Sequence, residues 1–478
     1  MRISPFPGPD KIGFVLILIS SVLLGIWATM HTIALRNILL GFGGLGAIYY
    51  WAKWLKSLNK HSFEMGLPRF AWAPMVLVVL MLLWVVIHFF CFSVDPQRQL
   101  SELSSTWVRA LLAVLIGSAT GLVLIRNAKF APWLWLGLIV SFLILIGQYI
   151  PKALQRGSIF GVDFFGGYIY WAKFNGVLAG TILIAGLLGL LIDCFRNDGT
   201  QGATQGAILP PWVKASHLIP VYSLFGIFLA AYSFVFIFDA KAGVGLAVIL
   251  IGFWILVGLG LLAIKILRLN KQKNLSSAYI KLAGLFFLIV LALGFLSYKH
   301  VKNNPGWERL FSDIAISAKI DQYSNWQNPH KYGYPQRGDG TTVAGNTYER
   351  VSWATVGLRL IGMQPLGNGL FRSFPEQVKK LAPEFSDTGI VYTHSAWIDL
   401  GLAFGLGGLI LTPLALLIAM LRAVMGLSGR YKATIITLSL ATLILYSVGE
   451  YAFQQGVEML FYLSGLVGGL SLVASPKK

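Results

Sequence analysis

Long apolar runs, each about as long as a membrane is thick, dominate the chain. The first of them, residues 12–30, contains no Asp, Glu, Lys or Arg. A helix of about 20 apolar residues crosses the roughly 30 Å of hydrocarbon in a bilayer. The pattern therefore predicts about twelve membrane-spanning helices, at residues 12–30, 34–52, 71–93, 107–125, 131–150, 174–193, 216–237, 243–267, 279–298, 395–421, 432–449 and 456–474.

The first two runs differ from the others. No small-x-small cleavage pattern follows residues 12–30, so we interpret this run as an uncleaved span and not as a signal peptide. The second run is interrupted by Arg36 and by four glycines between residues 41 and 46. It is the weakest of the predicted spans.

One long polar connection divides the chain. We expect nine helices in residues 1–298, a cap formed by residues 299–394, and three helices in residues 395–478. Helical spacing within the cap predicts three short helices. Their marker residues are Trp307, Leu310, Phe311 and Ile314 for the first, Trp353, Val356, Leu360 and Ile361 for the second, and Pro375 and Glu376 for the third. The Gly-, Pro- and Asn-rich residues 328–346 between them should be irregular or mobile.

Composition supports an all-α integral membrane protein. Hydrophobic residues make up 56% of the 478 positions and charged residues 12%, whereas soluble domains carry about 25% charged residues. The net charge of +19 falls mostly in short loops, which favours contact with anionic lipid headgroups over nucleic acid. Cys91 and Cys194 lie near span ends that should face opposite sides, so we expect no disulfide between them.

The loop charges predict an orientation. Positive residues mark the cytoplasmic side of a membrane protein. With about twelve spans, one side receives nearly all of the basic connections: Lys53, Lys56, Lys60 and Arg69; Arg126 and Lys129; Lys265, Arg268, Lys271 and Lys273; Arg422, Arg430 and Lys432; and Lys477 and Lys478. Both termini are then cytoplasmic, and the cap is external.

His394, at the start of the tenth span, is the first candidate for chemistry. A helix N-terminus disfavours imidazolium, and a neutral imidazole can accept a proton from a hydroxyl. The alternative is an ordinary interfacial histidine. Arg350 is a candidate phosphate ligand, because its guanidinium fork matches two oxygens, or else a solvated surface arginine. Arg359 and Arg372 compete with it for the same role.

Further charged residues lie near the external boundary. Lys241 is either a functional ligand or the surface partner of Asp239. Asp399 either orients the imidazole of His394 or caps the first turn of the helix. Because the chain contains no Asp-x-Asp pair, no His-x-x-x-His and no phosphate-binding glycine loop, metal- and ATP-dependent chemistry are both disfavoured.

Two stretches resemble the bacterial O-antigen ligase family, within the wider ligase and Wzy-type polymerase superfamily. Residues 350–369, RVSWATVGLRLIGMQPLGNG, are similar to the family's Arg…Trp…Pro-x-Gly-x-Gly pattern, and residues 394–408, HSAWIDLGLAFGLGG, to its His…Gly-Leu-x-Gly signature. A weaker match covers residues 239–246, where Lys241 stands in place of the family's arginine.

The resemblance implies a GT-C-like membrane glycosyltransferase with a large periplasmic loop. A glycan would pass from undecaprenyl diphosphate to a sugar hydroxyl of lipid A–core, with inversion and without metal or other cofactor. His394 would be the base, and Arg350 and Lys241 would hold the diphosphate, with Asp399, Arg359, Arg372 and Asp239 as possible supporting residues. The enzyme would lie in a Gram-negative inner membrane, with its active site periplasmic.

Other functions stay open at this stage. A Wzy-type polymerase or a protein O-oligosaccharyltransferase would use the same donor with a different acceptor. A transporter of polar lipid belongs to another class, and it should carry ionisable residues near the bilayer midplane. The functional candidates here lie at the external rim instead, which favours chemistry at the membrane surface.

Overall fold

The computed structural model describes residues 10–27, 31–61, 70–157, 169–197, 215–269, 309–385, 392–427, 429–448 and 454–472, with a few isolated positions between these ranges. Across the described residues the protein is helical. The one departure there is an isolated antiparallel bridge between Gln336 and Thr342. The all-α class predicted from the sequence is therefore confirmed for these residues.

The apolar helices make this a multi-pass membrane protein. Eight helical segments of the described chain are long and apolar enough to cross a bilayer: Ile33–Ser57, Ala73–Phe92, Pro96–Arg126, Ala128–Arg156, Ala172–Phe195, Leu218–Ile237, Lys241–Gly258 and Ala396–Val424. The helices of the bundle are α1 (Lys11–Trp27), α2 (Ile33–His61), α3 (Ala73–Phe92), α4 (Pro96–Glu102), η1 (Leu103–Trp107), α5 (Val108–Arg126), η2 (Ala128–Phe130), α6 (Ala131–Arg156), α7 (Ile169–Asn197), α8 (Ala215–Tyr232), η4 (Ser233–Ile237), α9 (Lys241–Leu269), α15 (Ala396–Val424), α16 (Lys432–Val448) and α17 (Gln454–Leu470).

Most of the predicted membrane spans coincide with helices of the structure. The range 279–298 lies outside the described residues apart from isolated positions, and every other predicted range overlaps a helix. Helices α1 and α16 are apolar but reach only 17 residues each. At 1.5 Å per residue, such a helix is about 25 Å long, a little short of the hydrocarbon core.

Glycines allow α5 and α17 to pack closely in the middle of the bundle. The two helices run in the same direction. A Cβ atom on Gly117 would lie 2.1 Å from the carbonyl oxygen of Tyr462, and one on Gly465 would lie 2.5 Å from that of Val114. Lipid provides no hydrophobic drive for association between helices, so close backbone contact through small residues is an effective way to pair them.

A break in α15 receives the Pro365–Gly369 turn. Phe404 and Gly405 depart from helical geometry, with Gly405 at φ +58°. The turn supplies partners for backbone groups freed by the break: Asn368 N–H donates to Leu402 O (3.1 Å), Gly369 N–H to Ala403 O (2.7 Å) and Leu406 N–H to Pro365 O (2.9 Å). The Pro-x-Gly-x-Gly motif thus attaches the cap to a spanning helix.

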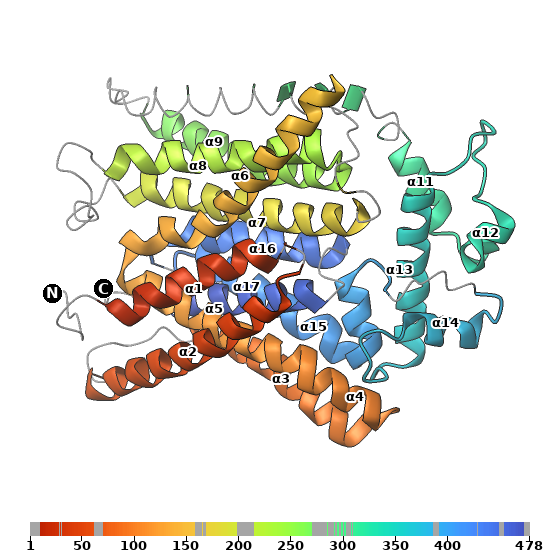
Figure 1. Ribbon diagram of the computed structural model, residues 1–478, viewed down its shortest axis with the longest axis horizontal. Helices are drawn as coiled ribbons and strands as arrows, with labels where there is room; N and C mark the ends of the chain where they lie inside the picture. The colour runs from red at the N-terminus through yellow and green to blue at the C-terminus, as the bar shows by residue number, and fades with distance from the viewer. Residues whose placement is uncertain are drawn as a thin grey trace.

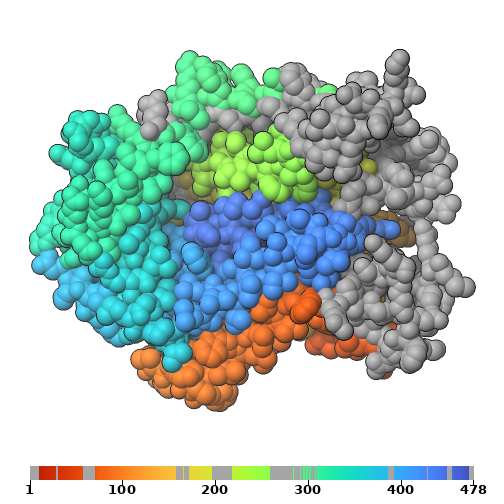
Figure 2. Space-filling view, turned by 180° about the vertical axis from the view of Figure 1, so that it is seen from behind, coloured from red at the N-terminus to blue at the C-terminus, as the bar shows by residue number. Residues whose placement is uncertain are grey.

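The cap lies beside one end of the bundle (Figure 1), and Figure 2 shows from behind how its green and cyan helices border the blue C-terminal helices. Its described residues, 309–385, form α11 (Leu310–Ser317), η6 (Ser324–Gln327), α12 (Pro329–Tyr332), α13 (Gly345–Met363) and α14 (Phe374–Leu381). The two helices predicted around Trp353 and Pro375 are confirmed as α13 and α14. All four marker residues of α13 are buried.

The first predicted cap helix exists, but its buried face was predicted wrongly. Phe311 is 82% exposed, whereas Asp313 is 1% exposed. Asp313 accepts hydrogen bonds from Arg337 Nε (2.7 Å) and from the Ala344 backbone N–H (3.2 Å). This buried ion pair turns the polar side of α11 inward. Residues 328–344 are irregular as predicted, except for the single turn of α12 and the bridge at Gln336, whereas Gly345 and Asn346 already belong to α13.

Candidate active site

His394 lies between two aromatic rings. Its imidazole stacks on Phe174 at 5.4 Å between centroids and on Trp353 at 5.8 Å, with interplanar angles of 15° and 19°. Phe174 comes from α7, Trp353 from the cap helix α13, and His394 from the residues before α15. Three segments that are distant in sequence therefore fix the plane of one imidazole ring.

The backbone at His394 is left-handed, with φ +60°. A non-glycine residue in this region costs roughly 1–3 kcal/mol and persists only where its surroundings enforce it. Its neighbours provide that constraint. Asp399 Oδ1 accepts the Thr393 N–H at 2.9 Å, and Thr393 Oγ1 accepts the Ser395 N–H at 3.2 Å. Such strained residues cluster at functional sites.

Burial, and second the nearby positive charge of Arg350, together lower the pKa of His394 to about 4. The imidazole is thus neutral near pH 7. The sequence predicted a neutral ring because of the helix N-terminus. In the structure, the larger cause is desolvation between the aromatic rings, and the second is a cation.

Arg350 reaches the same place from α13. Its guanidinium carbon lies 5.1 Å from the centroid of the Phe174 ring, within cation–π range. Its Nη1 donates to the carbonyl of Val448, at the end of α16, at 3.0 Å. The structure therefore brings Arg350 and His394 together, both against Phe174.

The two competing arginines behave differently. Arg359 forms a two-pronged ion pair with Asp321, at 2.8 and 2.7 Å, on the exposed side of the cap. Arg372 lies over the ring of Tyr392 at 5.6 Å, two residues before His394. Of the two arginines, Arg372 lies next to the candidate site, whereas Arg359 belongs to an ordinary surface ion pair.

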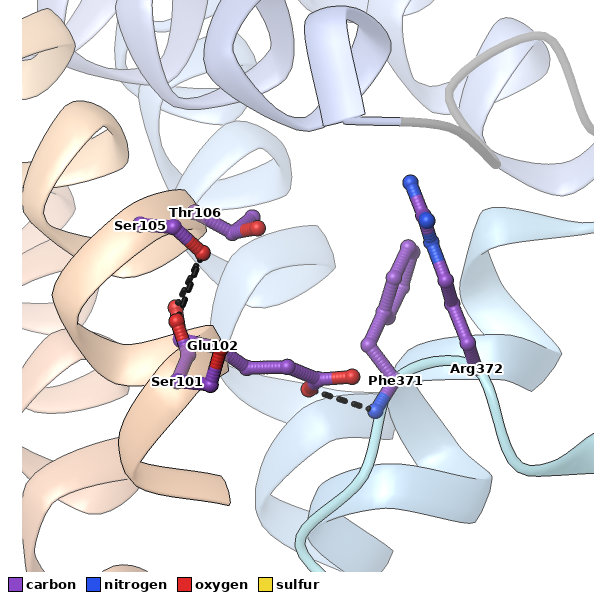
Figure 3. A pocket seen from close by; sticks show the side chains of 6 residues that line it. All are labelled: Ser101, Glu102, Ser105, Thr106, Phe371 and Arg372. Atoms are coloured by element: carbon purple, nitrogen blue, oxygen red, sulfur yellow. Dashed lines mark hydrogen bonds between the residues drawn. The ribbon is translucent and has the colours of Figure 1, made fainter. Parts of the chain in front are cut away.

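Arg372 also lines a cavity of about 170 Å³. Figure 3 shows Ser101, Glu102 and Ser105 on one side of it and Phe371 and Arg372 on the other. The cavity combines hydroxyl groups, one carboxylate and one guanidinium, so it can accept a polar group of a substrate.

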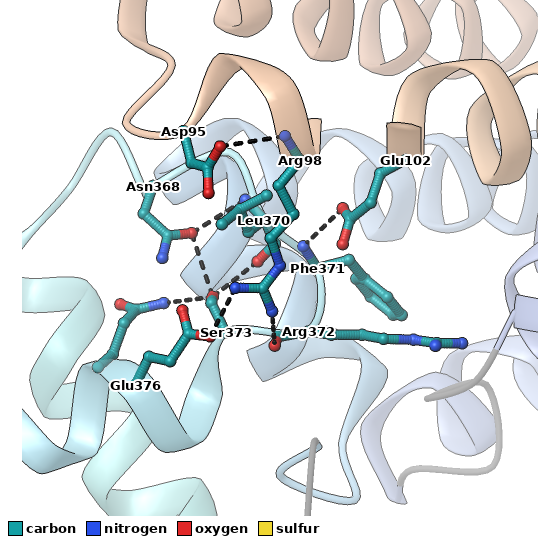
Figure 4. Close-up of polar contacts among 10 residues, drawn as sticks. Asp95, Arg98, Glu102, Asn368, Leu370, Phe371, Arg372, Ser373 and Glu376 are labelled. Carbon is teal, nitrogen blue, oxygen red and sulfur yellow. Dashed lines mark hydrogen bonds and ion pairs between the residues drawn. The ribbon is translucent and has the colours of Figure 1, made fainter. Parts of the chain in front are cut away.

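Helix α4 holds the segment that carries Arg372. Arg98 forms an ion pair with Glu376 and donates from Nη2 to the carbonyl of Arg372 at 3.3 Å. Glu102 accepts the Phe371 N–H at 3.0 Å (Figure 4). No sequence pattern indicated these anchoring residues, nor Phe174 and Tyr392. Each is an isolated polar or aromatic residue whose role depends on a partner far away in the chain.

Lys241 opens α9, and its relation to His394 is indirect. Phe238, three residues earlier, packs on α7: a Cβ on Gly176 would lie 2.2 Å from the Phe238 ring. The link therefore reaches the same end of α7 as Phe174. Among the described residues, however, no hydrogen bond or ion pair joins Lys241 to His394, Arg350 or Asp239. Asp239 is exposed, with φ +43°.

Asp399 acts on the backbone and not on the imidazole. Asp399 is 1% exposed, and its Oδ1 accepts a hydrogen bond from the Thr393 N–H. The first turn of α15 is capped by Ser395, whose Oγ accepts the Ile398 N–H at 3.4 Å. Asp399 therefore fixes the backbone just before the helix, and its hydrogen bond with Thr393 matches neither of the two roles considered from the sequence. In the described part of the chain, no group of three or more His, Cys, Asp or Glu side chains is placed to hold a metal.

The fold and the site define the protein's class: a multi-pass α-helical membrane protein with a small cap and a basic, aromatic-lined site where cap and bundle meet. No protein-family model matches the chain, and no curated protein matches it significantly.

Proposed function

We propose that this protein is an O-antigen ligase-type glycosyltransferase. It would transfer a glycan from undecaprenyl diphosphate to a sugar hydroxyl of lipid A–core, at the periplasmic face of a Gram-negative inner membrane. The observation that carries the proposal is the neutral imidazole of His394, held between Phe174 and Trp353 with the guanidinium of Arg350 close by.

The reaction balances without any further reagent. The acceptor oxygen attacks the anomeric carbon of the donor sugar and forms the new C–O bond with inversion. The bond from that carbon to the diphosphate oxygen breaks, and the electron pair leaves with the diphosphate. His394 accepts the proton of the acceptor hydroxyl, while Arg350 stabilises the charge that develops on the leaving group.

The low pKa of His394 allows donor binding to control the strength of this base. A base with a pKa near 4 is neutral at pH 7, but it binds a proton weakly. When the anionic diphosphate binds beside Arg350, its charge offsets the repulsion that Arg350 exerts on an imidazolium. The pKa of His394 then rises, so donor binding strengthens the base.

Arg372 is the second diphosphate ligand in this proposal, ahead of Arg359, because it lines a cavity and lies over Tyr392. Lys241 keeps a supporting role at the edge of the site, since its link packs on the end of α7 that carries Phe174.

Purified protein in lipid nanodiscs, given lipid-linked glycan and lipid A–core, tests the proposal. We expect glycosylated lipid A–core and free undecaprenyl diphosphate in equal amounts, without added metal. His394→Asn should abolish both products, whereas His330→Asn, in the exposed residues of α12, should not.

Other outcomes would identify other functions. Glycan chains that lengthen on the lipid carrier would indicate a polymerase, and modification of a protein Ser or Thr would indicate a protein O-oligosaccharyltransferase. If the lipid-linked glycan crosses the bilayer unconsumed, the protein is a transporter and the proposal is wrong.

A further inference from the structure

A second cluster of charges lies in the bundle, away from His394. Glu458 of α17 contacts two arginines: its Oε2 lies 3.1 Å from Arg36 Nε, and its Oε1 lies 3.1 Å from Arg109 Nε. The Trp27 indole N–H also donates to Glu458 Oε2, at 2.9 Å. The cluster thus joins α1, α2, α5 and α17. It also accounts for Arg36, which interrupts the second predicted span.

The cluster carries an excess positive charge. The side chains of Arg36 and Glu458 are 2% and 0% exposed, and together they already form a balanced buried pair. Arg109, whose side chain is 16% exposed, adds a cation that this pair does not require. Ionisable groups inside membrane helices are costly and usually mark a function. The additional positive charge of Arg109 therefore favours the binding of an anion at this cluster.

A cavity of about 210 Å³ adjoins Arg109. It is lined by four polar residues and two leucines: Asn37, Leu40, Ser104, Ser105, Arg109 and Leu112. Since Arg109 presents its Nε to Glu458, its two Nη groups remain, and they have no hydrogen-bond partner among the described residues. The volume corresponds to on the order of ten water-sized spheres, enough for a phosphate group and a few waters but not for an acyl chain.

The serines come from an unusual turn. Ser104 and Ser105 belong to η1, a π-helical turn inserted between α4 and α5. Such turns occur often at functional sites. Ser105 also lines the cavity of Arg372, so the two cavities share a wall. Ser105 thus lies between Arg109, in one cavity, and Arg372, in the other, and the two adjoining cavities together make up a groove.

The residues around the groove are lipid-facing in character. Ile33 and Ile38 on α2 are 55% and 54% exposed, and Val108 and Leu111 on α5 are 47% and 45% exposed. An anionic ligand that binds beside Arg109 must therefore also tolerate contact with these apolar side chains. A membrane lipid satisfies this condition, because its headgroup and chains are joined.

We propose that Arg109, with the amide N–H groups of Asn37, binds the phosphate of an anionic membrane lipid. The hydroxyls of Ser104 and Ser105, which donate to the Ser101 carbonyl at 3.2 and 2.7 Å, line the site. The acyl chains lie along the exposed apolar residues of α2 and α5, and the headgroup points along the groove towards Arg372. This site does not depend on the proposed glycosyl transfer, and lipid binding can be measured without it.

Thermal unfolding of the detergent-purified protein with short-chain phosphatidylglycerol tests the site. A ligand that binds only the folded state raises Tm in a saturable way. We expect such a rise with phosphatidylglycerol and a much smaller one with phosphatidylcholine. Arg109→Gln should weaken the apparent affinity about 10- to 100-fold, the value of a charge-assisted hydrogen bond. The matched control Arg359→Gln, on the exposed cap surface, should leave it unchanged.

Two variants at the cavity separate a loss of lipid binding from a loss of folding. Arg109→Gln leaves the balanced Arg36–Glu458 pair in place, so we expect it to fold. Ser104→Phe adds bulk to the cavity wall from an exposed position and keeps all three charges, so it should block lipid binding independently. If either variant responds to phosphatidylglycerol as the natural protein does, the site is not at Arg109. If inorganic phosphate at the same concentration gives the same shift, the ligand is free phosphate and the lipid assignment is wrong.

Discussion

Arg350 lies close enough to His394 to lower the pKa of its imidazole, and both side chains rest against the ring of Phe174. The positive charge of Arg350 disfavours protonation of His394, and an anion bound beside Arg350 would offset this effect. An anionic leaving group is what a lipid-linked diphosphate donor would bring.

The pH dependence of stability should report the burial of His394. Its pKa falls from 6.5 to about 4 on folding. Between these values the unfolded chain binds a proton that the folded protein does not, so stability is full above pH 6.5 and is lost as the pH falls towards 4. At 1.36 kcal/mol per pH unit the loss is about 3 kcal/mol. Tm of the natural protein should therefore fall more between pH 7 and pH 4.5 than Tm of His394→Asn. Equal falls in both would contradict it.

Replacing Arg350 by Lys should impair donor binding although the charge is retained. Lysine lacks the planar fork that holds two phosphate oxygens, and losing one charge-assisted bond costs about 1.5–3 kcal/mol. We expect kcat/KM for lipid-linked glycan to fall about 10- to 100-fold. Arg359→Lys, at an exposed ion pair, is the control and should keep normal kinetics. A normal Arg350→Lys enzyme would remove Arg350 from the diphosphate site.

The docking of the Pro365–Gly369 turn should depend on Gly405. A Cβ at this position would lie 1.9 Å from the Pro365 carbonyl oxygen, and φ is +58°. The left-handed conformation alone costs roughly 1–2 kcal/mol for a residue with a Cβ, and the clash adds to it. Gly405→Ala should lower Tm and expose residues 365–369 to protease. In contrast, Gly362→Ala, in α13 with no atom within 4 Å of its Cβ position, should be neutral or stabilising.

The buried ion pair of the cap should matter more than the exposed one. Asp313 and Arg337 have side chains only 1% and 8% exposed. Removing one partner of such a pair typically costs about 3–5 kcal/mol, because the other charge stays buried. Asp313→Asn should therefore lower Tm markedly. Asp321→Asn removes the partner of Arg359 at the surface, where such pairs contribute little, and should leave Tm unchanged. The reverse order would contradict the burial assigned to α11.

Local sequence patterns were sufficient for the helices. Apolar runs of membrane length led to the spanning helices, and the spacing of Trp353, Val356, Leu360 and Ile361 led to α13. Both signals are periodic along the chain and need no knowledge of distant partners. The same logic failed for α11, because the buried Asp313 is satisfied by Arg337, 24 residues away.

The sequence by itself determined which residues were candidates for chemistry. His394 at the start of an apolar run and Arg350 near the start of a predicted helix stand out for their residue type and position alone. Only the tertiary structure decided that the two meet at Phe174, that Arg372 lines a cavity while Arg359 pairs with Asp321, and that Glu458 contacts two arginines. These relationships depend on contacts across up to 431 residues of sequence, as between Trp27 and Glu458. Helical periodicity describes one segment at a time, so such contacts are settled only when the helices pack.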